Sequence, residues 1–187
     1  MKFVASLILV LWISVGFFLG IGGLSKLSVD ETLENIQKRQ TELMAKKFPP
    51  IDVEGVTIDN EYDYQIFNEN KGIETYFKWT VLLPRFTALI ITAMSFGLLG
   101  AVVALVRQLS INGKNILEVK YLSLPILGIL TGLVVLGLSY LLPTLITKGA
   151  NEIRPITLMF LCLFCGICTD NFYKKIESSF DKLFTGK

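Results

Sequence analysis

Residues 86–106 read FTALIITAMSFGLLGAVVALV, a stretch without one charged side chain. A helix crosses the roughly 30 Å hydrocarbon core of a bilayer with about 20 apolar residues, because each residue rises about 1.5 Å. In lipid, the backbone N–H and C=O groups must bond within the segment, which a helix achieves. The stretch meets the required length, so we expect a membrane-spanning helix over residues 84–106.

Three further apolar runs predict spans over residues 3–24, 122–146 and 155–173. The last run is the shortest and needs residues 170–173 to reach the interface. With 52% hydrophobic and 18% charged residues, the chain is too apolar for an ordinary soluble domain. A signal peptide competes for the first run, but that run exceeds the roughly 7–15 apolar residues of a signal peptide. The predicted fold class is an all-α membrane protein with a bundle of four transmembrane helices.

The predicted spans leave residues 25–83 as one sizeable insertion between the first and second helices. Ser28 and Glu31 have the spacing of a capping box, which predicts an amphipathic helix over residues 28–48 that ends before two prolines. Apolar residues alternate around Tyr64 and Thr75, which predicts a hairpin over residues 51–80. We therefore expect a small α+β module, whose helix packs on the module itself or, as an alternative, associates with a second copy.

Acidic side chains concentrate in the same insertion, but they lack the glycine and the distal glutamate of a calcium-binding loop. They are Asp52, Glu54, Asp59, Glu61 and Asp63. A solvated acidic face is the expectation.

The distribution of lysine and arginine predicts the orientation. The short connection over residues 107–121 and the tail over residues 174–187 are rich in lysine, and with four spans they lie on the same side as Lys2. The positive-inside tendency makes that side cytoplasmic. Both termini are then cytoplasmic in a bacterial inner-membrane protein, and residues 25–83 and the turn over residues 147–154 face outward.

Small residues recur at a spacing of four in three of the predicted spans, and such positions let helix backbones approach closely in lipid. They are Gly16 and Gly20 in the first span, Ala93, Gly97 and Ala101 in the second, and Gly128 and Gly132 in the third. In the fourth, Cys162, Cys165 and Cys168 share one side of a helix. We expect these positions to form helix-packing or subunit contacts in a homo-oligomer.

Catalytic and metal chemistry finds little support in this sequence. The chain has no histidine, the commonest general base and metal ligand. Three cysteines do not complete the four ligands that an iron–sulfur cluster normally needs, so we expect them to pack. The middles of the first three spans contain no ionisable residue, which disfavours an ion-coupled transporter. We predict no enzyme activity, no cofactor and no metal, and the absence of a basic stripe predicts no direct nucleic-acid binding.

The cytoplasmic surface is the predicted place for a partner. Asp170 is either an interfacial carboxylate paired with a lysine or, in an oligomer, part of a ring at a pore mouth or a polar contact between subunits. The tail is amphipathic and either lies on the bilayer surface or enters the groove of a soluble partner. The partner-docking candidates are Lys114, Asp170, Lys174, Lys175, Ile176, Phe180, Leu183 and Phe184.

The four-span layout and the closing run LCLFCGICTDNFYKK, residues 161–175, resemble KwaA-type membrane subunits of the Kiwa anti-phage defence system. The resemblance implies a homo-oligomer, a tetramer, in the bacterial inner membrane. It also implies a soluble cytoplasmic DNA-binding effector and a role in sensing membrane disturbance during phage attack. No functional residue is carried over, because the layout contains no specific motif.

The function predicted from these features is a non-enzymatic membrane sensor and scaffold that recruits a cytoplasmic effector. Two alternatives stay open. One is a pore or channel that changes membrane permeability, and the other is a membrane immunity protein against a toxin.

Overall fold

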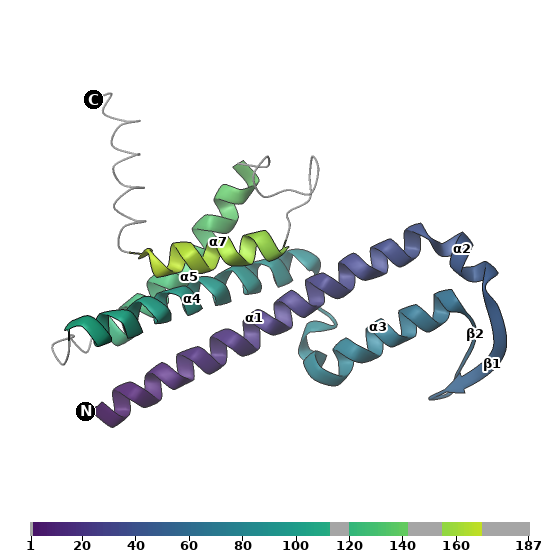
Figure 1. Cartoon of the computed structure of the whole chain (residues 1–187), viewed down its shortest axis with the longest axis horizontal. Coiled ribbons are helices and arrows are strands. Elements are labelled where there is room, and N and C mark those ends of the chain that lie inside the picture. Colours follow the sequence, from purple (N-terminus) through teal and green to yellow (C-terminus); the bar gives the residue numbers. More distant parts are fainter. Residues whose placement is uncertain (1, 113–119, 142–154, 170–187) are drawn as a thin grey trace. The chain divides into compact units, whose positions relative to one another are not determined.

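The computed structural model describes residues 2–112, 120–141 and 155–169, and these residues are mostly helical. The chain divides into two compact units. One comprises residues 22–88, hereafter the module, and the other comprises the described residues within 1–21 and 89–187, hereafter the bundle. Figure 1 shows the elements of both units along the chain.

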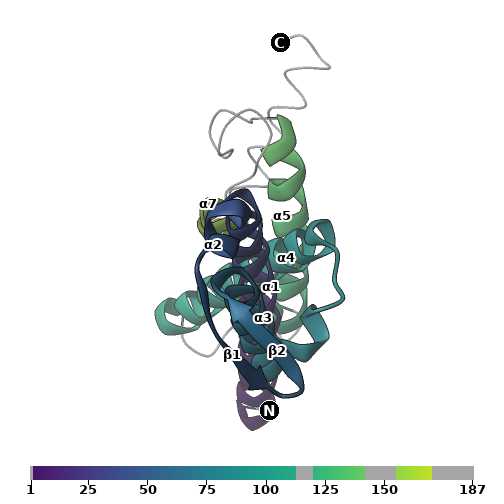
Figure 2. The ribbon, with the colours of Figure 1, turned by 90° about the vertical axis from the view of Figure 1, so that its right-hand side faces the viewer.

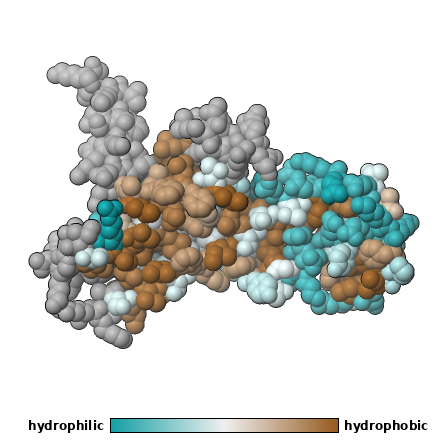
Figure 3. Space-filling model, viewed as in Figure 1, coloured by the Kyte–Doolittle hydropathy of each residue, from teal (hydrophilic) through white to brown (hydrophobic). Residues whose placement is uncertain are grey.

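The bundle contains the first part of α1 (Lys2–Lys38), most of α4 (Arg85–Asn112), α5 (Lys120–Leu141) and α7 (Pro155–Ile167). Helices α1, α4 and α5 are long and apolar enough to cross a membrane, whereas the described part of α7 is apolar but shorter. Large apolar side chains stay exposed on all four helices, including Phe18, Val103, Leu130 and Phe164. Figure 3 shows this surface as predominantly hydrophobic. These features are those of a membrane protein.

The module contains the second part of α1, then α2 (Gln40–Ala45), a two-stranded antiparallel sheet, α3 (Glu61–Phe77) and the short 3-10 helix η1 (Lys78–Thr80). Strands β1 (Lys47–Val53) and β2 (Val56–Asn60) pair with Val53 opposite Val56. Figures 1 and 2 show the hairpin beside α2 and α3. Glu54 and Gly55 both have positive φ, 55° and 81°, which suits a two-residue hairpin turn.

Two predicted features of the first half of the insertion are wrong. No separate helix begins at Ser28, because α1 runs unbroken from Lys2 to Lys38, and Ser28 lies inside it with its carbonyl accepting from the Thr32 hydroxyl at 3.0 Å. The helix also ends before residue 48, and α2 follows after a turn at Arg39. A glycine costs a helix only about 1 kcal/mol, and Gly22 is closely covered by the Trp79 ring. Packing against Trp79 therefore offsets this cost, and α1 continues through Gly22 and Gly23.

The predicted hairpin over residues 51–80 is also wrong in its position. The strands lie earlier, at residues 47–60, and residues 61–77 form α3 instead. Alternation around Tyr64 competed with a helical stripe, since Tyr62, Ile66, Ile73 and Phe77 also recur at helical spacing. The Asn60 side chain decides the outcome by accepting from the backbone N–H of Asp63 at 2.9 Å, which caps the helix.

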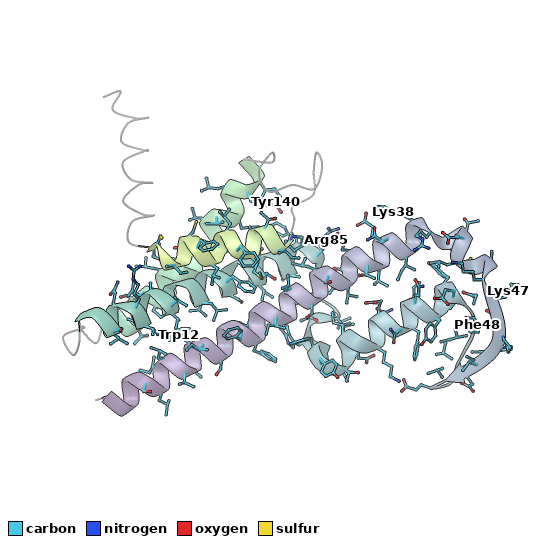
Figure 4. The ribbon with its side chains drawn as sticks, in the orientation of Figure 1. Trp12, Lys38, Lys47, Phe48, Arg85 and Tyr140 are labelled. Carbon is cyan, nitrogen blue, oxygen red and sulfur yellow. The ribbon has the colours of Figure 1, made fainter. Side chains whose placement is uncertain are left out.

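A small side-chain core holds the module together. Its buried members come from α1, α2, β2, α3 and η1: Leu27, Ile36, Leu43, Ile58, Ile73 and Thr80. On the rim of this core, the Phe48 ring of β1 meets the Tyr64 ring of α3 edge-on, with 6.4 Å between centroids. Figure 4 labels Phe48 beside α3. The prediction of a small α+β unit between the first two long apolar helices therefore describes the module, although its elements differ.

Candidate functional site

The closest helix contacts of the bundle lie where α4 meets α5. A Cβ atom added to Gly97 would lie 2.8 Å from the backbone nitrogen of Gly132, and closer still to the carbonyl oxygen of Gly128. From the other side, a Cβ on Gly128 would lie 2.5 Å from that of Ala101, and one on Gly132 would meet the Ala93 carbonyl. All five residues were singled out from the sequence, and the structure brings them together backbone against backbone.

Helix α7 meets α4 through a second pair of glycines. A Cβ on Gly100 would lie 2.9 Å from the Gly166 Cα, and one on Gly166 would meet the Gly97 carbonyl oxygen. Gly97 therefore lies at the junction of three helices. Sequence reasoning missed Gly100 and Gly166 because it looked for small residues four apart, whereas Gly97 and Gly100 are three apart, a spacing that also shares a helix face.

Cys162 belongs to the same junction. Its thiol is buried and lies 3.9 Å from the Gly132 carbonyl oxygen, a weak hydrogen bond from α7 to α5. Cys165 is partly exposed and Cys168 is exposed. Among the residues that the structure describes, no group of three His, Cys, Asp or Glu side chains is placed to hold a metal ion. The geometry of Cys162 is that of a packing residue.

Helix α1 meets α4 differently. A Cβ on Gly16 would lie 2.8 Å from the end of the Leu99 side chain, and one on Gly20 would lie 3.3 Å from the Phe96 ring. At both positions the nearest atoms belong to side chains, and those of Leu99 and Phe96 can rotate. The α1–α4 contact is therefore more adaptable than the α4–α5–α7 junction.

Hydroxyl groups inside the bundle helices are satisfied by their own helices. Ser95 donates to the Ile91 carbonyl at 2.6 Å, Thr131 to that of Leu127 at 2.8 Å, and Ser139 to that of Leu136 at 2.5 Å. A polar group in an apolar environment is costly without such a bond. These hydroxyls therefore fit a membrane interior and do not depend on a ligand.

The acidic residues of the module have structural partners. Asp52 accepts from the Gly55 backbone N–H in the hairpin turn at 3.0 Å, and Glu54 forms an ion pair with Lys71. The Asn60 side-chain amide donates to Asp59 at 2.8 Å and to Asp63 at 2.7 Å. Glu61 accepts from Gln65 one turn along α3 at 2.7 Å. These carboxylates support the turn and the first turn of α3.

Two grooves run between α1 and α3 in the module and share Asn68 and Glu69 in their walls. One, near Arg39, has a volume of about 250 Å³, and the other, near Tyr76, about 480 Å³. Their walls mix polar and apolar side chains. They are surface features of the module without a concentration of charge.

An ion-pair chain connects the two long helices within the module. Glu34 of α1 accepts from Lys38 at 3.0 Å and from Arg85, the first residue of α4, at 3.4 Å. Hydrogen bonding and attraction from Lys38, together with the attraction of Arg85, lower the pKa of Glu34. Figure 4 labels Lys38 and Arg85. All three side chains are exposed enough for water to weaken the pairing.

The predicted partner-docking residues lie outside the described residues. They are Lys114, Asp170, Lys174, Lys175, Ile176, Phe180, Leu183 and Phe184. The same holds for the predicted turn over residues 147–154, the end of the third predicted span, residues 170–173 of the fourth, and residues 113–119 of the predicted cytoplasmic connection.

Comparisons with known proteins add no further constraint. No protein-family model, curated protein or solved structure matches this chain. The function is therefore argued from the geometry above.

Proposed function

We propose that this protein is a non-enzymatic sensor and scaffold of the bacterial inner membrane, with four spans and both termini in the cytoplasm. Three spans would be the apolar parts of α1, α4 and α5, and the fourth would extend α7 through residue 173. The close packing of α7 against α4 and α5 supports a fourth membrane helix, since both of these helices are proposed spans.

The observation that carries the proposal is the continuity of α1. This helix begins in the apolar bundle and ends in the polar module without a break in its hydrogen bonding, and α4 likewise contributes to both units. Helical connections resist bending more than loops do. A change in the membrane that displaces α1 in the bundle would therefore displace it in the module, and a change in the module would likewise reach the bundle. Sensing in this scheme requires two packings of the bundle with different affinity for a partner.

The adaptable contact is the expected place for such a change. Gly16 and Gly20 face rotatable side chains of α4, whereas α4, α5 and α7 meet through their backbones. We expect α1 to move against a rigid three-helix unit. Subunit contacts of a homo-oligomer then fall on surfaces that the chain does not use internally, such as the exposed side of α1 around Leu11.

The resemblance to KwaA-type subunits extends the proposal to anti-phage defence. In that form the protein is a tetramer that hands a soluble DNA-binding effector from the membrane to its target. The lysine-rich tail over residues 174–187 is the proposed docking segment.

The proposal is tested by co-purifying the full-length protein with the products of its neighbouring genes. We expect one soluble DNA-binding protein to stay bound to the full chain and to be lost when residues 174–187 are removed. The shortened protein must remain in the membrane fraction, which separates loss of docking from loss of folding.

Reconstitution into liposomes separates the sensor from the pore. The sensor gives no steady ion-selective current, and such a current from pure protein would favour the channel alternative. A full-length protein that retains no partner while conferring phage resistance would also overturn the scaffold role.

A further inference from the structure

The chain between α3 and α4 exposes large apolar and aromatic side chains next to the start of an apolar helix. Leu82 is 93% exposed, Tyr76 is 78% exposed, and Val81 and Phe86 are exposed as well. Single exposed apolar residues are ordinary on protein surfaces. Here these four gather within residues 76–86, hereafter the interfacial segment, which includes η1 and the first residues of α4.

A contact within the module shows which part of α1 lies beside the interfacial segment. A Cβ on Gly22 would lie 2.5 Å from the Trp79 ring and 3.1 Å from the Phe77 ring. Gly22 lies at the end of the apolar run of α1, two residues before Leu24 and just before the charged part of the helix begins at Lys26. Trp79 therefore lies at the level where α1 passes from apolar to polar sequence.

The chemistry of the segment fits the boundary between headgroups and acyl chains. Tryptophan and tyrosine concentrate at that boundary, where their rings are partly apolar and partly wet. Lys78 and Arg85 flank the apolar residues, and long cationic side chains reach lipid phosphates from such positions. From Phe86 onward the chain continues as an uncharged helix that is long enough to cross the bilayer.

We infer that residues 76–86 insert into the outer interface of the bilayer, with Leu82 and Tyr76 among the lipid chains and Lys78 at the phosphates. The segment then anchors the module to the bilayer, in addition to the anchoring that α1 and α4 provide. The occupant is lipid because the segment continues directly into an apolar helix and lies level with the end of the other. This inference rests on the proposed membrane spans.

Quenching of tryptophan fluorescence by brominated lipids tests the insertion, because Trp12 and Trp79 are the only tryptophans. The full chain is placed in phosphatidylcholine nanodiscs with bromine either near the headgroup or near the end of the acyl chain. Trp12→Phe leaves Trp79 as the native probe, and Leu82→Trp added to that background gives a fully exposed probe. We expect both to lose intensity with the shallow bromines more than with the deep ones.

Val56→Trp in the same background is the matched control. Val56 is also exposed, but it lies on the hairpin, which precedes α3, whereas the interfacial segment lies at the other end of α3. A helix of 17 residues such as α3 spans roughly 25 Å. The fluorescence added by this tryptophan should not change with brominated lipid.

The outcomes separate the inference from the proposed function. The difference between wild type and Trp12→Phe reports Trp12, which lies within the first proposed span. If the fluorescence of Trp12 is quenched and that of the tryptophan at Leu82→Trp is not, the insertion of the segment is wrong but the membrane spans stand. A second copy of the chain covering Leu82 would give that result. Unquenched Trp12 overturns the membrane spans and the inference with them.

Discussion

The bundle and the module of this chain differ in how closely the backbones of their elements approach one another. In the bundle, α4 meets α5 and α7 at glycines where backbone lies against backbone, alongside buried side chains such as Leu98, Val135 and Leu158. In the module, leucine and isoleucine side chains from α1, α2, β2 and α3 fill the space between elements. In water, removing such side chains from solvent drives packing, whereas in lipid that force is absent and close fit replaces it. Glycine contacts such as those of the bundle are typical of helices that pack in lipid.

The largest expected loss of stability comes from a substitution that breaks the backbone contact between α4 and α5. Gly97→Leu places a branched side chain where even a Cβ atom would lie within 3.0 Å of the α5 backbone at Gly128 and Gly132. We expect a loss of at least roughly 3 kcal/mol, the upper end for overpacking, and failure to elute as a single species in detergent. Gly137→Leu is the control, since a Cβ at Gly137 meets nothing within 4 Å. Normal behaviour of Gly97→Leu would show that the junction is not tight.

The next effect tests the side-chain core of the module. Leu43 is 1% exposed, so Leu43→Ala should cost about 2–5 kcal/mol through lost burial and a cavity. Hydrogen exchange should speed up across α3 and the hairpin but stay unchanged in α5. Ile51→Ala, at a half-exposed position of β1, should change neither. Faster exchange in α5 of the Leu43 variant would mean that the two units do not fold independently.

A smaller effect concerns the cap that begins α3. Asn60→Ala removes the bond to the Asp63 backbone N–H and should cost about 1 kcal/mol. Exchange should quicken in the first turn of α3, while Asn70→Ala, exposed in the middle of the same helix, leaves that turn unchanged. Equal exchange in the two variants would contradict the role of the cap.

The smallest effect is electrostatic and lies on the module surface. The Arg39 hydrogen bond, with help from Lys46, lowers the pKa of Glu42 from 4.5 to about 2. A lowered pKa means that the pairs stabilise the folded state above pH 4.5 and stop doing so as the pH falls toward 2. Arg39→Gln should move the Glu42 midpoint back toward 4.5 in an NMR titration of its carboxyl carbon. An unchanged midpoint would remove Arg39 as the cause, and because the group is fully exposed we expect little change in overall stability.

Sequence patterns predicted the apolar helices well because each pattern there has one physical solution. An uncharged run as long as residues 86–106 must be helical in lipid, and small residues such as Gly97 and Gly132 mark where helices approach. Spacing alone did not reveal that Gly166 of α7 completes the junction, since that depends on how α7 docks.

The module was harder to predict because local signals conflicted. Ser28 and Glu31 have a capping-box spacing, yet continuous packing along α1 overrides it. Tyr62, Tyr64 and Ile66 alternate like a strand, yet the Asn60 cap starts a helix one residue before Tyr62. Tertiary contacts such as that of Trp79 with Gly22 of α1 are also not visible in the linear sequence.

The central claim of the proposed function is that the hairpin and the end of α4 near Ser110 lie on opposite sides of a membrane. Single cysteines at Thr57 of the hairpin and Ser110 near the end of α4 test it in spheroplasts, with Cys162, Cys165 and Cys168 replaced by alanine. Both positions are exposed, so a membrane-impermeant maleimide reports only the side. We predict labelling of Thr57→Cys without permeabilisation and of Ser110→Cys only after it. Labelling of both from outside, or of Ser110→Cys alone, would contradict the account.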